Sequence, residues 1–217
     1  RDTDRSRGLG DVYKRQEERG YLSGIVRRVD EQYYTDEWAK CCLLLYKKEL
    51  LQKPPLCLQR LFFRHPDKMK MFLEENPSRS FDVENDYYLP EEAYQDKRAF
   101  DCWAECLYEE FPEILGYIMG KSCNGKDGAF PHEFIREFLE KQQNEKLTKA
   151  VFYGKFNSRG ARIVQDGRTL YEQAKCYRAQ ARELRLKFPQ SAKILLQLAK
   201  WMESEAQHDQ LEAEIVP

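Results

Sequence analysis

The sequence has no long apolar run: the longest, residues 41–46, has six residues, whereas a membrane-spanning helix needs roughly 18. It also has no excess of charge of one sign, since 36 Lys and Arg oppose 37 Asp and Glu. This balance excludes a uniformly basic nucleic-acid-binding protein and a highly charged disordered tail. There is no signal-peptide pattern, and the seven cysteines do not have the spacing of a disulfide framework. We therefore expect a cytoplasmic protein with reduced thiols.

Motifs for catalysis and nucleotide binding are missing as well. The sequence has neither of the phosphate-binding glycine loops, G-x-x-x-x-G-K-[ST] or G-x-G-x-x-G, and no G-x-S-x-G nucleophile elbow. Glu205 and His208 have the spacing found in di-iron helical bundles, but such a site requires a second pair that the sequence lacks. These absences favour a non-catalytic protein while leaving enzymatic activity open, and they predict no cofactor.

Four residues are the metal-ligand candidates of the chain: Cys102, Cys106, Cys123 and His132. Their spacing, C-x3-C-x16-C-x8-H, lacks the tight C-x2-C pairs that are typical of structural zinc sites. Cys102 and Cys106 also flank an apolar helical stripe, where cysteine commonly behaves as a small buried hydrophobic residue. The sequence therefore argues against a metal site at these four positions.

The pattern of apolar residues predicts an all-α fold. Prolines precede five runs of helical composition, and proline fits the first turn of a helix. We expect helices over residues 33–52, with Thr35 as the cap, and over residues 91–110 and 132–152, with a loop over residues 76–89. No segment alternates apolar and polar residues as a strand would. We predict an irregular array of about six shorter helices before a long C-terminal pair.

The C-terminal part has the most regular pattern. Residues 154–168 contain three glycines and read as a linker. Apolar residues then recur at intervals of four and three, which places them on one helical face: Leu170, Ala174, Tyr177, Ala181, Leu184 and Phe188. Pro189 ends this helix, and a second apolar helix follows at once. So short a connection predicts an antiparallel αα-hairpin over residues 169–217.

Residues 1–16 differ from the rest of the chain and have no helical or strand period. They resemble translated sequencing-adapter read-through of the kind found in reading frames assembled from environmental DNA; the alternative is a disordered basic arm. The first methionine is Met69, so we expect a C-terminal fragment of a larger cytosolic bacterial protein. The predicted organisation is this segment, a helical domain over 17–153, the linker and the hairpin.

Charge is segregated along the sequence. Residues 74–113 contain thirteen acidic and three basic residues, whereas residues 146–193 contain three acidic and twelve basic residues. Six basic residues in and after the linker are candidates for binding phosphate backbones: Arg159, Arg162, Lys175, Arg178, Arg182 and Arg185. The alternative is pairing inside the hairpin, in which Lys175 and Arg178 face Glu205, Asp209 and Glu212. We favour pairing or plain solvation, because the acidic segment would repel nucleic acid.

Aromatic residues are somewhat abundant, with 13 Tyr, 12 Phe and 3 Trp. Surplus aromatic side chains can mark a protein–protein interface, and Tyr171 and Trp201 are the candidates if the hairpin docks onto a partner. The sequence therefore favours a non-catalytic helical module for structural or protein–protein contact, whose partner is another protein or a missing N-terminal domain. The alternative is a nucleic-acid-binding accessory domain that uses the basic helix face over residues 155–187.

Overall fold

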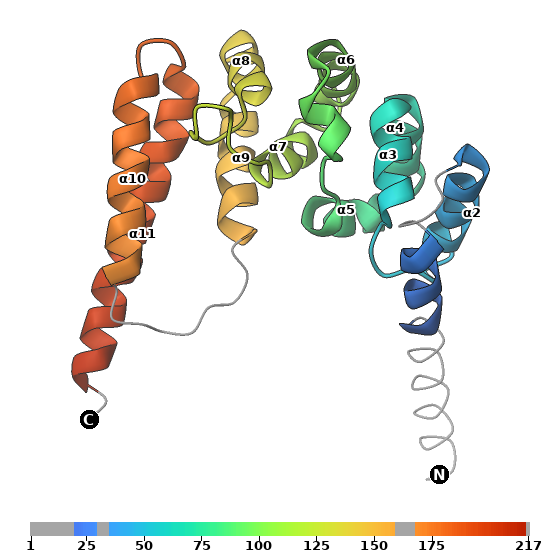
Figure 1. Ribbon diagram of the computed structural model, residues 1–217, viewed down its shortest axis with the longest axis horizontal. Coiled ribbons are helices and arrows are strands. Elements are labelled where there is room, and N and C mark those ends of the chain that lie inside the picture. The colour runs from blue at the N-terminus through green and yellow to red at the C-terminus, as the bar shows by residue number, and fades with distance from the viewer. Residues whose placement is uncertain (1–19, 30–34, 159–167, 216–217) are drawn as a thin grey trace. The chain divides into compact units, whose positions relative to one another are not determined.

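The computed structural model describes residues 20–29, 35–158 and 168–215. These residues form helices and turns without any strand, which confirms the predicted all-α class (Figure 1). Contacts divide the chain into two compact units, Arg1–Pro90 and Glu91–Pro217, and this division falls inside the range 17–153 that the sequence treats as one helical domain. Within the described part, no helix is both long enough and apolar enough to cross a membrane.

The N-terminal unit consists of short helices. Residues 20–29 are helical, and the elements that follow are α2 (Asp36–Lys47), α3 (Leu56–Arg64), α4 (Pro66–Glu75), the 3₁₀ helix η1 (Pro77–Arg79) and α5 (Ser80–Asp86). The Thr35 hydroxyl accepts a hydrogen bond from the Trp38 backbone N–H at 3.1 Å, as expected for the predicted cap. Helix α2 is shorter than the predicted range of residues 33–52 and ends at Lys47.

The prediction of a loop over residues 76–89 is wrong, because η1 and α5 occupy most of this segment. Although the composition of this segment is polar, it contains two core residues, Val83 and Tyr87, which are fully buried. The Tyr87 ring lies 6.2 Å from that of Phe62, and its hydroxyl donates to the Gln59 carbonyl oxygen at 3.0 Å. Burial of this pair, rather than local propensity, therefore stabilises the short helix.

The C-terminal unit begins with the 3₁₀ helix η2. Its elements are η2 (Glu91–Tyr94), α6 (Lys97–Tyr108), α7 (Pro112–Gly120), α8 (Glu133–Gln142), α9 (Glu145–Asn157), α10 (Arg168–Leu184) and α11 (Pro189–Ile215). The single helix expected over residues 132–152 is two helices, because Gln143 has a left-handed backbone with φ of 49°. The Asn144 side chain then accepts from the Leu147 N–H at 3.1 Å and begins α9.

Helices α7 and α9 approach closely through glycines. A Cβ atom on Gly116 would lie 2.5 Å from the Ala150 Cβ atom, and one on Gly154 would collide with the Tyr117 backbone. Gly154 therefore belongs to the interior of a helix contact, although the sequence placed it in the linker. The helix continues to Asn157, and residues 159–167 of the predicted linker lie outside the described residues.

Helices α10 and α11 lie side by side, with only residues 185–188 between them (Figure 1). Small and apolar side chains form the core of this pair: Leu170, Ala174, Ala199, Met202 and Ala206. The Glu140 carboxylate of α8 accepts from the backbone N–H groups of Gln190 and Ser191 at 2.7 and 3.3 Å. A side chain of α8 thus satisfies the first amides of α11 and attaches the pair to the rest of the unit.

Candidate functional site

A surface groove with a cavity volume of about 380 Å³ runs between α9 and α11. Its lining is aromatic and polar: Lys149, Phe152, Tyr153, Gln197, Lys200, Trp201 and Ser204. The two helices run in the same direction, since the start of α9 lies near the start of α11 and Phe156 contacts Trp201. We call these seven residues the α9–α11 groove.

The aromatic side chains of the groove belong to a continuous series. The Trp201 ring lies 4.5 Å from that of Phe156, which is 6.2 Å from Phe152, and Phe152 is 5.3 Å from Tyr153. Tyr153 also stacks on Tyr117 at 6.4 Å and still leaves 49% of its surface exposed. Such rings bury a large area at a low cost in side-chain entropy when a partner covers them.

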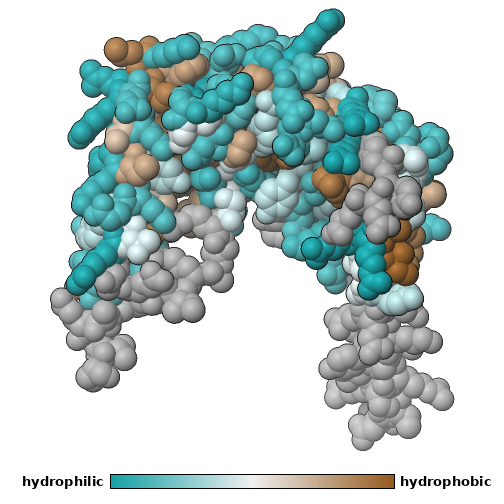
Figure 2. All heavy atoms as spheres, viewed as in Figure 1, coloured by the Kyte–Doolittle hydropathy of each residue, from teal (hydrophilic) through white to brown (hydrophobic). Residues whose placement is uncertain are grey.

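The charges at the groove are basic. Lys149 and Lys200 belong to the lining, and none of the lining residues is acidic. The Lys149 ammonium lies 2.8 Å from the Glu145 carboxylate, which raises the pKa of the lysine and keeps it charged. Elsewhere the face visible in Figure 2 is mostly hydrophilic. An aromatic floor with a cationic rim can bind an apolar side chain that has carboxylates beside it.

The sequence analysis named two interface candidates, Tyr171 and Trp201, and only one of them lies at the groove. Both are half-buried and pack against the core of the α10–α11 pair, but only Trp201 also lines the groove. Sequence reasoning missed Phe152 and Tyr153, because it placed Phe152 at the end of a helix over residues 132–152 and Tyr153 at the boundary between that helix and the linker. The available signal was the four-residue spacing of Phe152 and Phe156, which places both rings on one face of a helix that continues past residue 153.

The basic stripe of α10 is partly engaged in ion pairs. Arg178 makes two bonds to the Glu203 carboxylate, at 2.7 and 2.6 Å, and Lys175 lies 2.6 Å from Glu172 of its own helix. The internal partners therefore differ from the Glu205, Asp209 and Glu212 expected from the sequence. The remaining stripe residues, Arg182 and Arg185, are exposed.

Arg159 and Arg162, the other two candidates for phosphate contact, lie outside the described residues. Their contribution to a basic surface stays a prediction. Among the described residues, the exposed part of the candidate nucleic-acid surface consists of Lys175 and Arg182 on α10 and Arg185 directly after it.

The metal candidates have separate surroundings. Cys102 and Cys123 are exposed, Cys106 is half-buried, and partial burial of the Cys123 sulfur raises the pKa of its thiol. His132 is buried: its Nδ1 accepts from the Phe134 N–H at 3.3 Å, and burial lowers the pKa of its imidazole. Within the described ranges, no three His, Cys, Asp or Glu side chains are arranged to hold a metal ion. His132 acts there as the cap of α8.

A buried arginine organises the loop before α8. Arg136 is 2% exposed, donates to the Pro131 carbonyl oxygen at 2.8 Å and makes two bonds of 2.6 Å to Asp127. Hydrogen bonding to this guanidinium lowers the pKa of Asp127 to about 2. Gln180 of α10 bonds to the Gly128 carbonyl oxygen at 3.3 Å, so the network supports the position of α10.

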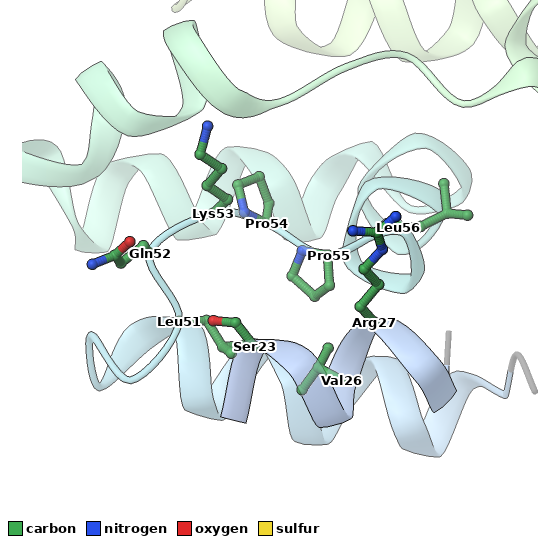
Figure 3. Close-up of a pocket in the computed structure, with 9 residues that line it drawn as sticks. All are labelled: Ser23, Val26, Arg27, Leu51, Gln52, Lys53, Pro54, Pro55 and Leu56. Carbon is green, nitrogen blue, oxygen red and sulfur yellow. The ribbon is translucent and has the colours of Figure 1, made fainter. Parts of the chain in front are cut away.

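The N-terminal unit has a cavity of its own, with a volume of about 440 Å³. It lies between the helical residues 20–29 and the segment 51–56, and Figure 3 shows Val26 and Arg27 facing Pro55 and Leu56. Its lining is mainly apolar, and Val26 is buried. No convergent set of polar groups lines it that would orient a small ligand, as binding sites usually require.

Comparison with protein-family models, curated proteins and solved structures yields no significant match to this chain.

Proposed function

We propose that this chain is a non-catalytic helical module for protein–protein contact, with the α9–α11 groove as its contact surface. The observation that supports the proposal is the series of aromatic rings ending at Tyr153, whose side chain remains 49% exposed. Interfaces are enriched in such residues at their centre, with a polar rim around them. The lysines at positions 149 and 200 supply that rim.

We also propose that the protein acts in the cytoplasm. All seven cysteines are free thiols, and four of them are exposed: Cys41, Cys102, Cys123 and Cys176. Exposed unpaired thiols suit a reducing compartment better than an oxidising one.

Site-directed photocrosslinking tests the proposed contact surface. A benzoylphenylalanine at position 153 in the purified chain should give a discrete protein adduct after irradiation in an extract of the source cells. Position 88, where Tyr88 is 45% exposed in the other unit, is the matched control. Lys200→Glu should abolish the adduct by reversing the rim charge. Equal labelling from positions 153 and 88 would show that the groove has no specific partner.

Nucleic-acid binding is the second candidate function, and the exposed face of Lys175, Arg182 and Arg185 supports it. The pairing of Arg178 with Glu203 weakens it, because that guanidinium is already engaged. Binding of a DNA duplex should weaken steeply with salt and again in the double variant Arg182→Glu/Arg185→Glu. An unchanged affinity of the double variant would exclude this face.

A further inference from the structure

His132 is a titratable side chain at the start of α8. The residue is 4% exposed, and its Nδ1 atom accepts a hydrogen bond from the Phe134 backbone N–H at 3.3 Å. An accepting Nδ1 carries no proton, so the neutral ring has its proton on Nε2, which lies 3.4 Å from the Glu133 carboxylate. The cap of α8 therefore exists only while this imidazole is neutral.

Protonation of the ring removes the cap. The second proton binds at Nδ1, where it points at the Phe134 N–H, and two donors that face each other repel. The imidazolium would also lie at the N-terminal end of α8, where the helix dipole disfavours a cation. The ring is packed between Tyr94 and Phe134, each at 4.8 Å, and this burial disfavours the charged form as well.

Charged groups on α8 and on the preceding loop surround the imidazole: Glu133, Arg136, Lys126 and Asp127. The two carboxylates favour the imidazolium, but both accept other hydrogen bonds. Asp127 accepts from the Arg136 guanidinium, and Glu133 accepts from the Lys126 backbone N–H at 3.2 Å. Burial, together with Arg136 and Lys126, outweighs the carboxylates and lowers the pKa of His132.

The acidic neighbours of His132 keep their charge in the pH range in which a histidine titrates. Hydrogen bonding to Arg136 lowers the pKa of Asp127 to about 2. Burial acts against the Glu133 carboxylate, but hydrogen bonds from backbone N–H groups hold its pKa below the usual value. Burial raises the pKa of the Tyr94 hydroxyl and of the Cys123 thiol, so both stay neutral in this range. The change of charge in this cluster is thus that of His132.

The start of α8 also holds the loop that contacts α10. Arg136 lies one turn after His132 and bonds to two residues of the loop 127–131. Gln180 of α10 bonds to the same loop, at a carbonyl oxygen and a backbone N–H that are 3.3 and 3.4 Å away. An α8 that loses its first turn would displace Arg136 and would therefore loosen the contact between the loop and α10.

We propose that His132 is an acid-sensitive switch, whose protonation as the pH falls below about 6.5 uncaps α8 and loosens the loop 127–131 from α10. The folded ring binds a proton less readily than the unfolded chain does, so the capped state is favoured at neutral pH and is lost on acidification. His132 does not line the α9–α11 groove, so the switch is independent of any partner that the groove binds.

Hydrogen exchange of the full 217-residue chain tests the switch. Between about pH 7.5 and about pH 5.5, the protection of the Phe134 amide should fall about fivefold after correction for the intrinsic pH dependence of exchange, which is the effect of losing one cap. The amide of Val151, in the buried part of α9, should keep its protection. Equal protection of Phe134 at both pH values would overturn the proposal.

Two substitutions show whether His132 is the group that titrates. His132→Asn keeps a side-chain acceptor for the cap but cannot bind a proton, so the protection of Phe134 should be the same at both pH values. His65→Asn is the matched control, because His65 is also at a helix start but makes no side-chain cap bond, and it should keep the fivefold loss. A His132→Asn variant that loses protection as the wild type does would refute the role of His132.

The wild-type chain provides a test that needs no folded variant. Nitrogen-15 NMR at about pH 7.5 should show the His132 ring with its proton on Nε2 and none on Nδ1. On acidification, protonation of Nδ1 should coincide with the loss of protection at the Phe134 amide. A ring that carries its proton on Nδ1 at about pH 7.5, or that becomes fully protonated while Phe134 stays protected, would contradict the proposed switch.

Discussion

The α7–α9 contact and the α10–α11 pair are held together in different ways. In the first, three glycines allow two backbones to approach until a single added methyl group would collide with main-chain atoms. In the second, leucine, methionine and alanine side chains fill the space, and Arg178 and Glu203 pair at the surface. Both contacts belong to the unit that carries the groove.

The difference has a consequence for the groove. Because α9 presents Gly154 to α7, the backbones meet there without a large side chain between them, while Phe152 and Phe156 of α9 continue to Trp201 of α11 and Tyr153 stacks on Tyr117 of α7. A backbone contact tolerates almost no change in volume, whereas a side-chain core can repack around small changes. Substitutions in the two contacts should therefore differ in size and in kind.

The largest effect is expected at the glycine contact. Gly154→Ala should lower the free energy of unfolding by about 3 kcal/mol, because the new methyl group meets the Tyr117 backbone, which cannot move aside. Gly24→Ala is the control, since a Cβ atom at that helical position meets nothing within 4 Å. That substitution should instead stabilise its helix by up to about 1 kcal/mol. Urea unfolding of both variants measures the difference, and equal signs would contradict the comparison.

A smaller effect is expected in the core of the α10–α11 pair. Met202→Ala should cost about 2 kcal/mol by leaving a cavity beside Leu170 and Ala174. Met202→Leu should cost less than about 1.5 kcal/mol, because the volume is conserved and the side chains can repack. Thermal unfolding of the two variants tests whether this contact is the tolerant one. A leucine variant as unstable as the alanine variant would show that it is not.

Two carboxylates beside the α10–α11 pair should give opposite pH dependences. The hydrogen bond to Arg136 lowers the pKa of Asp127 from 3.8 to about 2. The wild type should therefore be more stable than Asp127→Asn above pH 3.8, and this advantage should be lost as the pH falls from 3.8 to about 2. Burial raises the pKa of Glu140 above 4.5, so its folded form binds a proton more readily. Relative to Glu140→Gln, the wild type should therefore lose stability as the pH rises above 4.5. Unfolding of all three proteins across this pH range checks both signs.

The smallest effect is expected for the surface pair of Arg178 and Glu203. Both side chains are partly exposed, so water screens their attraction and ordering them costs entropy. Arg178→Gln and Glu203→Gln should each leave the melting temperature almost unchanged. A double-mutant cycle should still detect a favourable coupling at low salt that disappears at high salt. A coupling that stays large at high salt would contradict the expectation that water and salt screen the attraction between these two side chains.

The sequence predicted those features that depend on neighbours along one helix. The cap at Thr35 was predicted correctly, because the hydrogen bond that decides it is local. Helix α10 ends at Leu184, four residues before the predicted end at Phe188, and Pro189 begins α11. Helices α8 and α9 were predicted as one helix, because neither Gln143 nor Asn144 interrupts the helical pattern of the sequence. The short helix α5 was missed because only burial of Val83 and Tyr87 justifies it.

For the groove, the sequence identified Trp201 and not the aromatic residues of α9 beside it. What the sequence by itself determined is the all-α class, the near-neutral but segregated charge and the regular apolar face of α10, since each depends on composition or on a helical period. The tertiary structure decided the glycine contact between α7 and α9, the partner of Arg178 and the aromatic lining of the groove. These depend on which residues from distant segments meet, and a periodic pattern within one helix contains no information about its neighbour's face.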